Sequence, residues 1–338
     1  MVIRRRTLAL ATATLLLVSS ALYAQPNDQT RKLSNDERKE LQAISTLLSS
    51  GQTPANDLGL TWLGSDLLKA QGNKEYVPFT ISLDPSGLAG RRLSLYWRVV
   101  AKNAPPPDPK AKKDDKTALY AFENLHVVDV PAGSGPMKLS RSVVVGPGEY
   151  DLYILAKEPD PKKKSDPPAR AGMLKQTLIV PDLWNGELTT SSVVVAERID
   201  PLPAPLTPAQ QEERPYALGN MEITPANSTK FAKKHELSVF LLIYNAKVDA
   251  ANAPDVAVEY NFYNVANGTE KFFNKTNPQA LNAQTLPPGF DSSAGMTNGQ
   301  TIPLASFPEG DYRMEIKITD KLATRSITRD VKFSVSGS

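Results

Sequence analysis

GEYDLYI at residues 148–154 and GDYRMEI at residues 310–316 are the two stretches that decide the fold of this 338-residue chain. Both begin with a glycine, an acidic residue and a tyrosine. Each is followed by a second β-rich run, at 173–180 and at 325–335. The repeated unit is therefore a hairpin that closes a β-domain, and the chain is predicted to hold two related β-modules in tandem.

The rest of both modules has the period of β-strands with one buried face. Residues 77–83 and 93–99 alternate apolar with polar side chains, which predicts half-buried strands. Asn267 and Gly268 stand between two apolar runs, and both tolerate the positive φ of a two-residue hairpin turn. Further strands are predicted at 118–130, 138–145, 150–157, 173–180, 237–244, 256–263, 269–273, 302–306, 312–319 and 327–335. Short strands at this spacing predict an all-β fold of two sandwiches.

A short amphipathic helix is predicted at about 35–50, within a polar segment at 25–59. Ser34 and Glu37 have the spacing of a capping box, in which each side chain bonds the backbone N–H of the other residue. The helix then presents one apolar face, made of Leu41, Ile44, Leu47 and Leu48. This face is expected to pack on the first module or on a partner.

The N-terminal segment has the order of a secretory signal peptide. Arg4, Arg5 and Arg6 precede an apolar run at 8–18, and small residues lead to Ala24. The alternative is a membrane anchor, but a spanning helix needs about 20 apolar residues, and this run is shorter. Removal of 1–24 is therefore predicted, with the mature chain in the periplasm or outside the cell and no membrane span left.

Charge and cysteine content exclude several classes of partner. The chain has 39 Lys and Arg against 36 Asp and Glu, so loss of the three arginines of the export signal leaves equal numbers. A neutral mature chain gives no electrostatic argument for nucleic acid as a partner. The sequence has no cysteine, so disulfides and a lipoprotein anchor are excluded and each domain depends on core burial.

A proline-rich stretch at 197–218 is the predicted linker between the modules. It contains Pro201, Pro203, Pro205, Pro208 and Pro215, and this density favours an extended spacer. A proline-rich ligand for another domain is the alternative. Thr207 followed by Pro208 and Gln210 fits the start of one helical turn. The domains are accordingly predicted at 60–196 and 219–338.

The strand order resembles the immunoglobulin-like and fibronectin-III-like sandwiches of bacterial extracytoplasmic proteins. In those folds a tyrosine near the start of strand F bonds back to the backbone, and Tyr150 and Tyr312 match that position. An aromatic on strand C fills the core. Trp97 matches it in the first module, and Tyr260 or Phe262 matches it in the second. The resemblance implies two immunoglobulin-like domains in tandem.

The part from 214 to 320 also resembles the accessory β-domain of secreted proteins that carry von Willebrand A-related or Gly-Trp-x-Thr-Asp domains. Neither defining motif occurs in this sequence. The activity of such proteins is therefore not carried over, and the fold alone does not give a function.

No motif for catalysis or cofactor binding is found. The two histidines, His126 and His235, are isolated, and His126 is expected on a strand surface. Zinc needs three or four convergent ligands. Nucleophile elbows and phosphate-binding loops are absent. No catalytic, cofactor-binding or metal-ligating residue is assigned, although calcium bound by scattered Asp and Asn at a sandwich end remains an alternative.

The sequence therefore predicts an exported, non-enzymatic protein that associates with a protein of the cell envelope. Leu41, Ile44 and Leu48 on the helix, or the edge strand at 138–145, are the expected contacts. The alternative is a module that binds carbohydrate or an envelope polymer by stacking on Trp62 or Trp184. A coplanar pair of exposed rings would favour sugar, and buried indoles would favour the protein partner.

Overall fold

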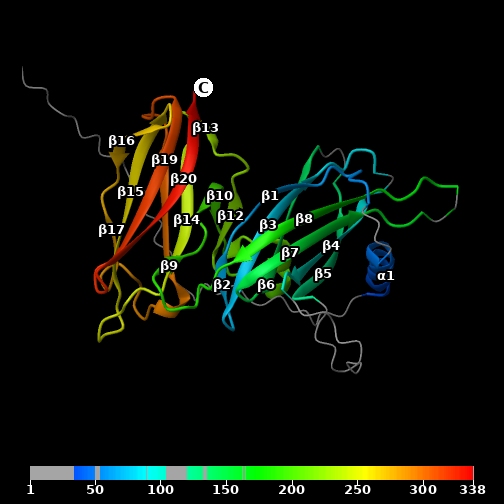
Figure 1. The fold of residues 1–338 in the computed structure, drawn as a ribbon, viewed down its shortest axis with the longest axis horizontal. Helices are drawn as coiled ribbons and strands as arrows, with labels where there is room; N and C mark the ends of the chain where they lie inside the picture. The colour runs from blue at the N-terminus through cyan, green and yellow to red at the C-terminus, as the bar shows by residue number, and fades with distance from the viewer. Residues whose placement is uncertain are drawn as a thin grey trace, which may run out of the picture. The chain divides into compact units, whose positions relative to one another are not determined.

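The computed structural model describes residues 34–49, 54–88, 90–103, 120–131, 135–161, 163 and 165–337, and the fold is mainly β. One compact unit, the first sandwich, is drawn from Ala24–Asp182 and Thr207–Pro215. The other, the second sandwich, is drawn from Leu183–Leu206 and Tyr216–Ser338 (Figure 1). The predicted all-β fold class is confirmed. The predicted signal peptide lies outside the described residues, and no helix within them is long and apolar enough to cross a bilayer.

The first sandwich consists of two antiparallel sheets. In one sheet, β3 pairs with β6 and also with the short strands β1 and β2; in the other, the order is β5-β4-β7-β8. The strands are β1 (Thr61–Ser65), β2 (Leu68–Ala70), β3 (Lys74–Leu83), β4 (Arg92–Ala101), β5 (Phe122–Asp129), β6 (Met137–Val145), β7 (Gly148–Lys157) and β8 (Ala171–Val180). The inward residues of both sheets form one apolar core.

Trp97 is the central side chain of that core. Its indole packs edge-on to Phe79 and is stacked with Phe122. The buried indole N–H donates to the carbonyl of Ser142 at 3.1 Å, so the polar atom of this large ring is satisfied. Replacing such a residue with alanine costs about 3–5 kcal/mol. The sequence-based assignment of Trp97 to the core is confirmed.

The second sandwich has the same two-sheet plan with additional strands. One sheet has the order β11-β12-β10-β14-β18, with β9 also on β14, and the other has the order β13-β20-β19-β15-β16, with β17 also on β15. The strands are β9 (Thr189–Thr190), β10 (Val194–Pro201), β11 (Ala217–Leu218), β12 (Met221–Pro225), β13 (Lys230–Ala232), β14 (Glu236–Tyr244), β15 (Asp255–Ala266), β16 (Thr269–Lys275), β17 (Gln279–Asn282), β18 (Met296–Pro303), β19 (Gly310–Asp320) and β20 (Arg325–Ser336), with a 3₁₀ turn η1 (Ser292–Ala294) before β18.

The two tyrosines of the repeated stretch make the same hydrogen bond. The Tyr150 hydroxyl donates to the carbonyl of Gly146 at 2.9 Å, and the Tyr312 hydroxyl donates to the carbonyl of Pro308 at 2.8 Å. Each bond reaches back four residues and fixes the turn that leads into the strand. Both rings are buried in their cores. The expected tyrosine bond to the backbone is therefore present in both sandwiches.

The hairpin between β15 and β16 has the predicted turn. Ala266 pairs with Thr269 across a two-residue loop. In that loop Asn267 has φ 51° and Gly268 has φ 74°. Positive φ at both positions gives the turn a twist that matches the flanking strands.

The sequence pattern misses much of β18, because its buried side chains are polar. Asn298 accepts from the Tyr260 hydroxyl and donates to Gln279, and Gln300 accepts from Gln279. Both Asn298 and Gln300 are buried between the sheets. Polar groups are tolerated there because each finds a partner. Only the end of this strand, near Ile302, shows the apolar signal that predicts a strand.

The range predicted as a linker, 197–218, is divided between the two sandwiches. Its first residues belong to β10, which pairs with β12 over five positions and with β14 over three. Helix α2 (Pro208–Glu213) follows, with the predicted capping box between Thr207 and Gln210, and it belongs to the first sandwich. The second sandwich thus begins at Leu183 and does not include Thr207–Pro215. The prolines in this range predict a linker, but β10 forms because it pairs with β12 and β14.

Candidate interaction surface

Helix α1 (Asn35–Ser49) covers part of the outer face of the sheet β5-β4-β7-β8 (Figure 1). The predicted capping box is present between Ser34 and Glu37. Ile44 is fully buried against three side chains of the sheet, Tyr96, Leu125 and Leu155. The helix residues Leu41, Leu47 and Leu48 are partly buried around it. The face offered by Leu41, Ile44 and Leu48 as a partner contact is therefore occupied within the chain.

The two tryptophans considered for sugar stacking are both half-buried. Trp62 lies on β1, and one side of its ring is stacked on Phe79 at 5.6 Å between centroids, with 18° between the planes. Trp184 belongs to the second sandwich. Core packing thus covers one face of the Trp62 ring, and neither indole is fully exposed.

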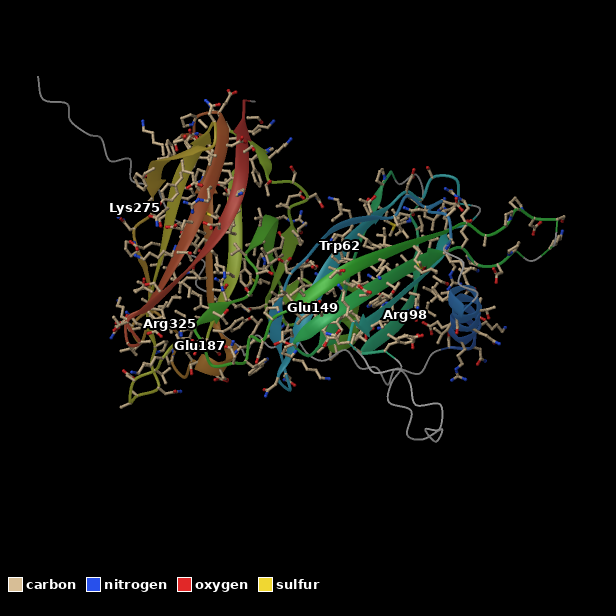
Figure 2. The ribbon with its side chains drawn as sticks, viewed as in Figure 1. Trp62, Arg98, Glu149, Glu187, Lys275 and Arg325 are labelled. Carbon is tan, nitrogen blue, oxygen red and sulfur yellow. The ribbon has the colours of Figure 1, made fainter. Side chains whose placement is uncertain are left out.

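A stack of one arginine and two tyrosines lies on the same outer face as α1. Figure 2 labels Arg98 on β4. Its direct cross-strand neighbour is Tyr153 on β7. Its guanidinium carbon is 5.2 Å from the Tyr153 ring centroid and 4.6 Å from that of Tyr120. Arg98 Nη1 also donates to the Tyr120 hydroxyl at 2.8 Å. Cation–π contacts and one hydrogen bond thus hold this guanidinium in one orientation.

The charged side chains near this stack have hydrogen-bond partners of their own. Lys175 on β8 lies 5.4 Å from the Tyr153 ring and forms an ion pair with Asp151 at 2.8 Å. The hydrogen bond from Lys175 lowers the pKa of the Asp151 carboxyl, and the same bond raises the pKa of the lysine. Glu123 on β5 is the other cross-strand neighbour of Arg98, but its carboxylate accepts a hydrogen bond from the Tyr96 hydroxyl. Burial, and next this hydrogen bond, raise the pKa of Tyr96.

Arg98 itself has no carboxylate partner among the residues that the structure describes. No described Asp or Glu oxygen lies within 4.0 Å of its guanidinium, and its buried Nε has no hydrogen-bond acceptor in the described set. The side chain is half-buried as a whole. A buried N–H without an acceptor is costly, because its hydrogen bond to water is lost and not replaced.

The second sandwich carries an arginine–tyrosine pair on the equivalent pair of strands. Tyr263 on β15 faces Arg313 on β19, and the guanidinium carbon lies 4.4 Å from the ring centroid. This arginine is fully paired: it binds Glu270 through Nε and Nη2 at 2.8 and 2.7 Å, Asp330 at 2.6 Å and Glu315 at 3.4 Å. The bonds to Glu270 raise the pKa of Arg313 and lower that of Glu270.

The linker helix carries a second polar cluster, which is buried inside the first sandwich. Glu212 of α2 lies 3.0 Å from Nε2 of His126 on β5, and both side chains are 10% exposed. The His126 ring packs edge-on to Trp97 at 5.1 Å. Arg141 on β6 is 5% exposed and lies 5.9 Å from the Trp97 ring. We call His126, Arg141 and Glu212 the linker-helix cluster.

The linker-helix cluster corrects one expectation. His126 is expected on a strand surface but is buried, because α2 covers it. The strand β6, which is expected to be an edge strand, pairs with β3 and also contacts α2. Burial lowers the pKa of Arg141, while the carboxylates of Glu213 and Glu212 act against this shift. Within the described residues, no group of three or more His, Cys, Asp or Glu side chains could hold a metal ion.

The comparisons with known proteins do not assign this chain to a family. No family model matches it, and no curated protein matches it. Among solved structures, red sea bream transglutaminase aligns with 91% of this chain at 10% sequence identity and a TM-score of 0.20. The alignment spans 35% of that protein's chain. A likeness at this level supports neither a shared fold nor a shared activity.

Proposed function

We propose that this chain is an exported, non-enzymatic protein-association module of the periplasm or the cell exterior. Its contact surface is the outer face of β4, β7 and β8, next to helix α1. The observation that carries the proposal is the cation–π contact of Arg98 with the rings of both Tyr120 and Tyr153. Tyrosine and arginine are the residue types that most often dominate binding energy in protein interfaces.

The physical state of this surface supports association. Arg98 and Tyr153 are held by the ladder between β4 and β7, and Tyr120 is bonded to Arg98. Side chains that are already ordered lose little entropy when a partner arrives. The exposed Ile179 lies on the same face of β8 as Lys175 and adds apolar area.

Export rests on the N-terminal segment. Arg4 to Arg6, the apolar run at 8–18 and the small residues up to Ala24 have the order of a cleavable signal. The absence of cysteine fits a chain that folds by core burial after export. Recognition of carbohydrate through Trp62 or Trp184 is the weaker alternative, since both indoles are half-buried.

The test is photo-crosslinking in the native host. Benzoylphenylalanine at Thr177, an exposed outward position of β8, should give one dominant protein adduct in the exported fraction. The matched control is the same residue at Lys332, the exposed cross-strand neighbour of Arg313 on the second sandwich. An adduct at Thr177 and none at Lys332 is the expected result. No adduct at Thr177, or equal adducts at both positions, would contradict the proposed surface.

A further inference from the structure

We infer that Arg98 is a recognition residue for a single carboxylate of the partner, an aspartate or glutamate side chain. This inference rests on the proposed function, because it names the chemistry that the outer face of the first sandwich selects. The partner carboxylate would accept hydrogen bonds from the guanidinium N–H groups that are not buried, beside the rings of Tyr120 and Tyr153.

The contrast between the two sandwiches carries the inference. Arg313 and Arg98 each form a cross-strand cation–π pair with a tyrosine, on the outer face of equivalent strand pairs. Arg313 is bonded to Glu270, Glu315 and Asp330. For Arg98, no described carboxylate lies within salt-bridge distance. Among the residues that the structure describes, the first sandwich thus presents the cation without the carboxylates that the second sandwich supplies to Arg313.

The geometry of the stack suits this ligand. A guanidinium has five N–H donors in a fixed plane, and carboxylates bind its edge with two parallel hydrogen bonds. The rings of Tyr120 and Tyr153 contact Arg98 and reduce its exposure to water. Lower hydration strengthens a charge-assisted bond relative to the same pair on an open surface.

The surrounding charges indicate one carboxylate and not a polyanion. Asp151 is held by Lys175, and Glu123 is held by Tyr96. These two acidic groups face the same surface as Arg98. They would repel a run of acidic residues, so the fitting segment has an isolated Asp or Glu among neutral side chains.

The experiment measures the guanidinium directly. The mature chain is labelled with ¹⁵N-arginine, and the Nε–Hε resonance of Arg98 is assigned with the variant Arg98→Lys. The probe is acetyl-Gly-Glu-Gly-amide, and acetyl-Gly-Gln-Gly-amide is the neutral control. We expect a saturating shift of the Arg98 resonance with the glutamate peptide, at millimolar affinity as suits so small a ligand. The Arg313 resonance should stay unmoved, because its carboxylates are already in place.

Three results would overturn the inference: no shift at Arg98, the same shift with the glutamine peptide, or an equal shift at Arg313. The crosslink from Thr177 is independent of this titration. If the adduct forms and Arg98 does not respond to the peptide, the proposed function stands and the carboxylate inference fails. If Arg98 responds and Thr177 gives no adduct, the proposed function fails instead.

Discussion

Replacing Glu212 with glutamine should loosen helix α2 from the first sandwich. The change removes the charge opposite His126 and one of the two carboxylates that act on Arg141, while the size of the side chain stays nearly the same. Breaking a fully buried ion pair costs about 3–5 kcal/mol. Since the introduced amide can still bond His126 and the site is 10% exposed, the expected loss is about 1–3 kcal/mol.

Urea unfolding of the mature chain, read by hydrogen exchange of the β5 and β6 amides, measures this loss in the first sandwich alone. The control variant is Asp129→Asn, which removes a charge from the ion pair between Arg92 and Asp129 on the same sandwich. That pair has a separation of 3.6 Å and side chains 62% and 88% exposed, so its loss should cost below about 0.5 kcal/mol. Equal effects of the two variants would refute a structural role for the linker-helix cluster.

Three further predictions concern the fold. A chain that begins at Leu183 should fold cooperatively, whereas one that begins at Tyr216 lacks β9 and β10 and should show a broad or absent thermal transition by circular dichroism. Tyr312→Phe removes the hydroxyl that donates to the Pro308 carbonyl and should lower the free energy of unfolding by about 1 kcal/mol. An unchanged midpoint of urea unfolding would show that this hydrogen bond does not stabilise the fold. Ile44→Asp places a charge in a fully buried position and should detach α1, so that limited proteolysis cuts at 35–49; persistent protection would contradict the docking of α1.

Local signals in the sequence accounted for much of the fold. The tyrosine bonds, the turn at Asn267 and Gly268 and the capping box at Ser34 depend on residues within a few positions of one another. Alternation along β4 and β7 also separates inward from outward side chains. In GEYDLYI, Tyr150 points inward and Tyr153, three residues later, points outward. Because successive side chains of a strand point to opposite faces, this odd spacing was enough to place Tyr153 on the surface.

Non-local pairing accounts for what the sequence left undecided. The strand β10 is stabilised by β12 and β14, and its proline-rich continuation suggested a spacer. The bond between His126 and Glu212 joins positions 86 residues apart. The contact of Arg98 with Tyr120 likewise joins residues 22 positions apart. No periodicity connects such residues, so the candidate site could not be assembled from the sequence.

The central claim is that the face centred on Arg98 binds a protein partner through a carboxylate. Isothermal titration of the purified mature chain with the protein identified from the Thr177 adduct tests it most directly. We predict that Arg98→Gln weakens binding by at least about tenfold, as expected for a charge-assisted bond. The matched variant Arg313→Gln on the second sandwich should leave the affinity unchanged. Equal affinities for Arg98→Gln and the unaltered chain would contradict the account.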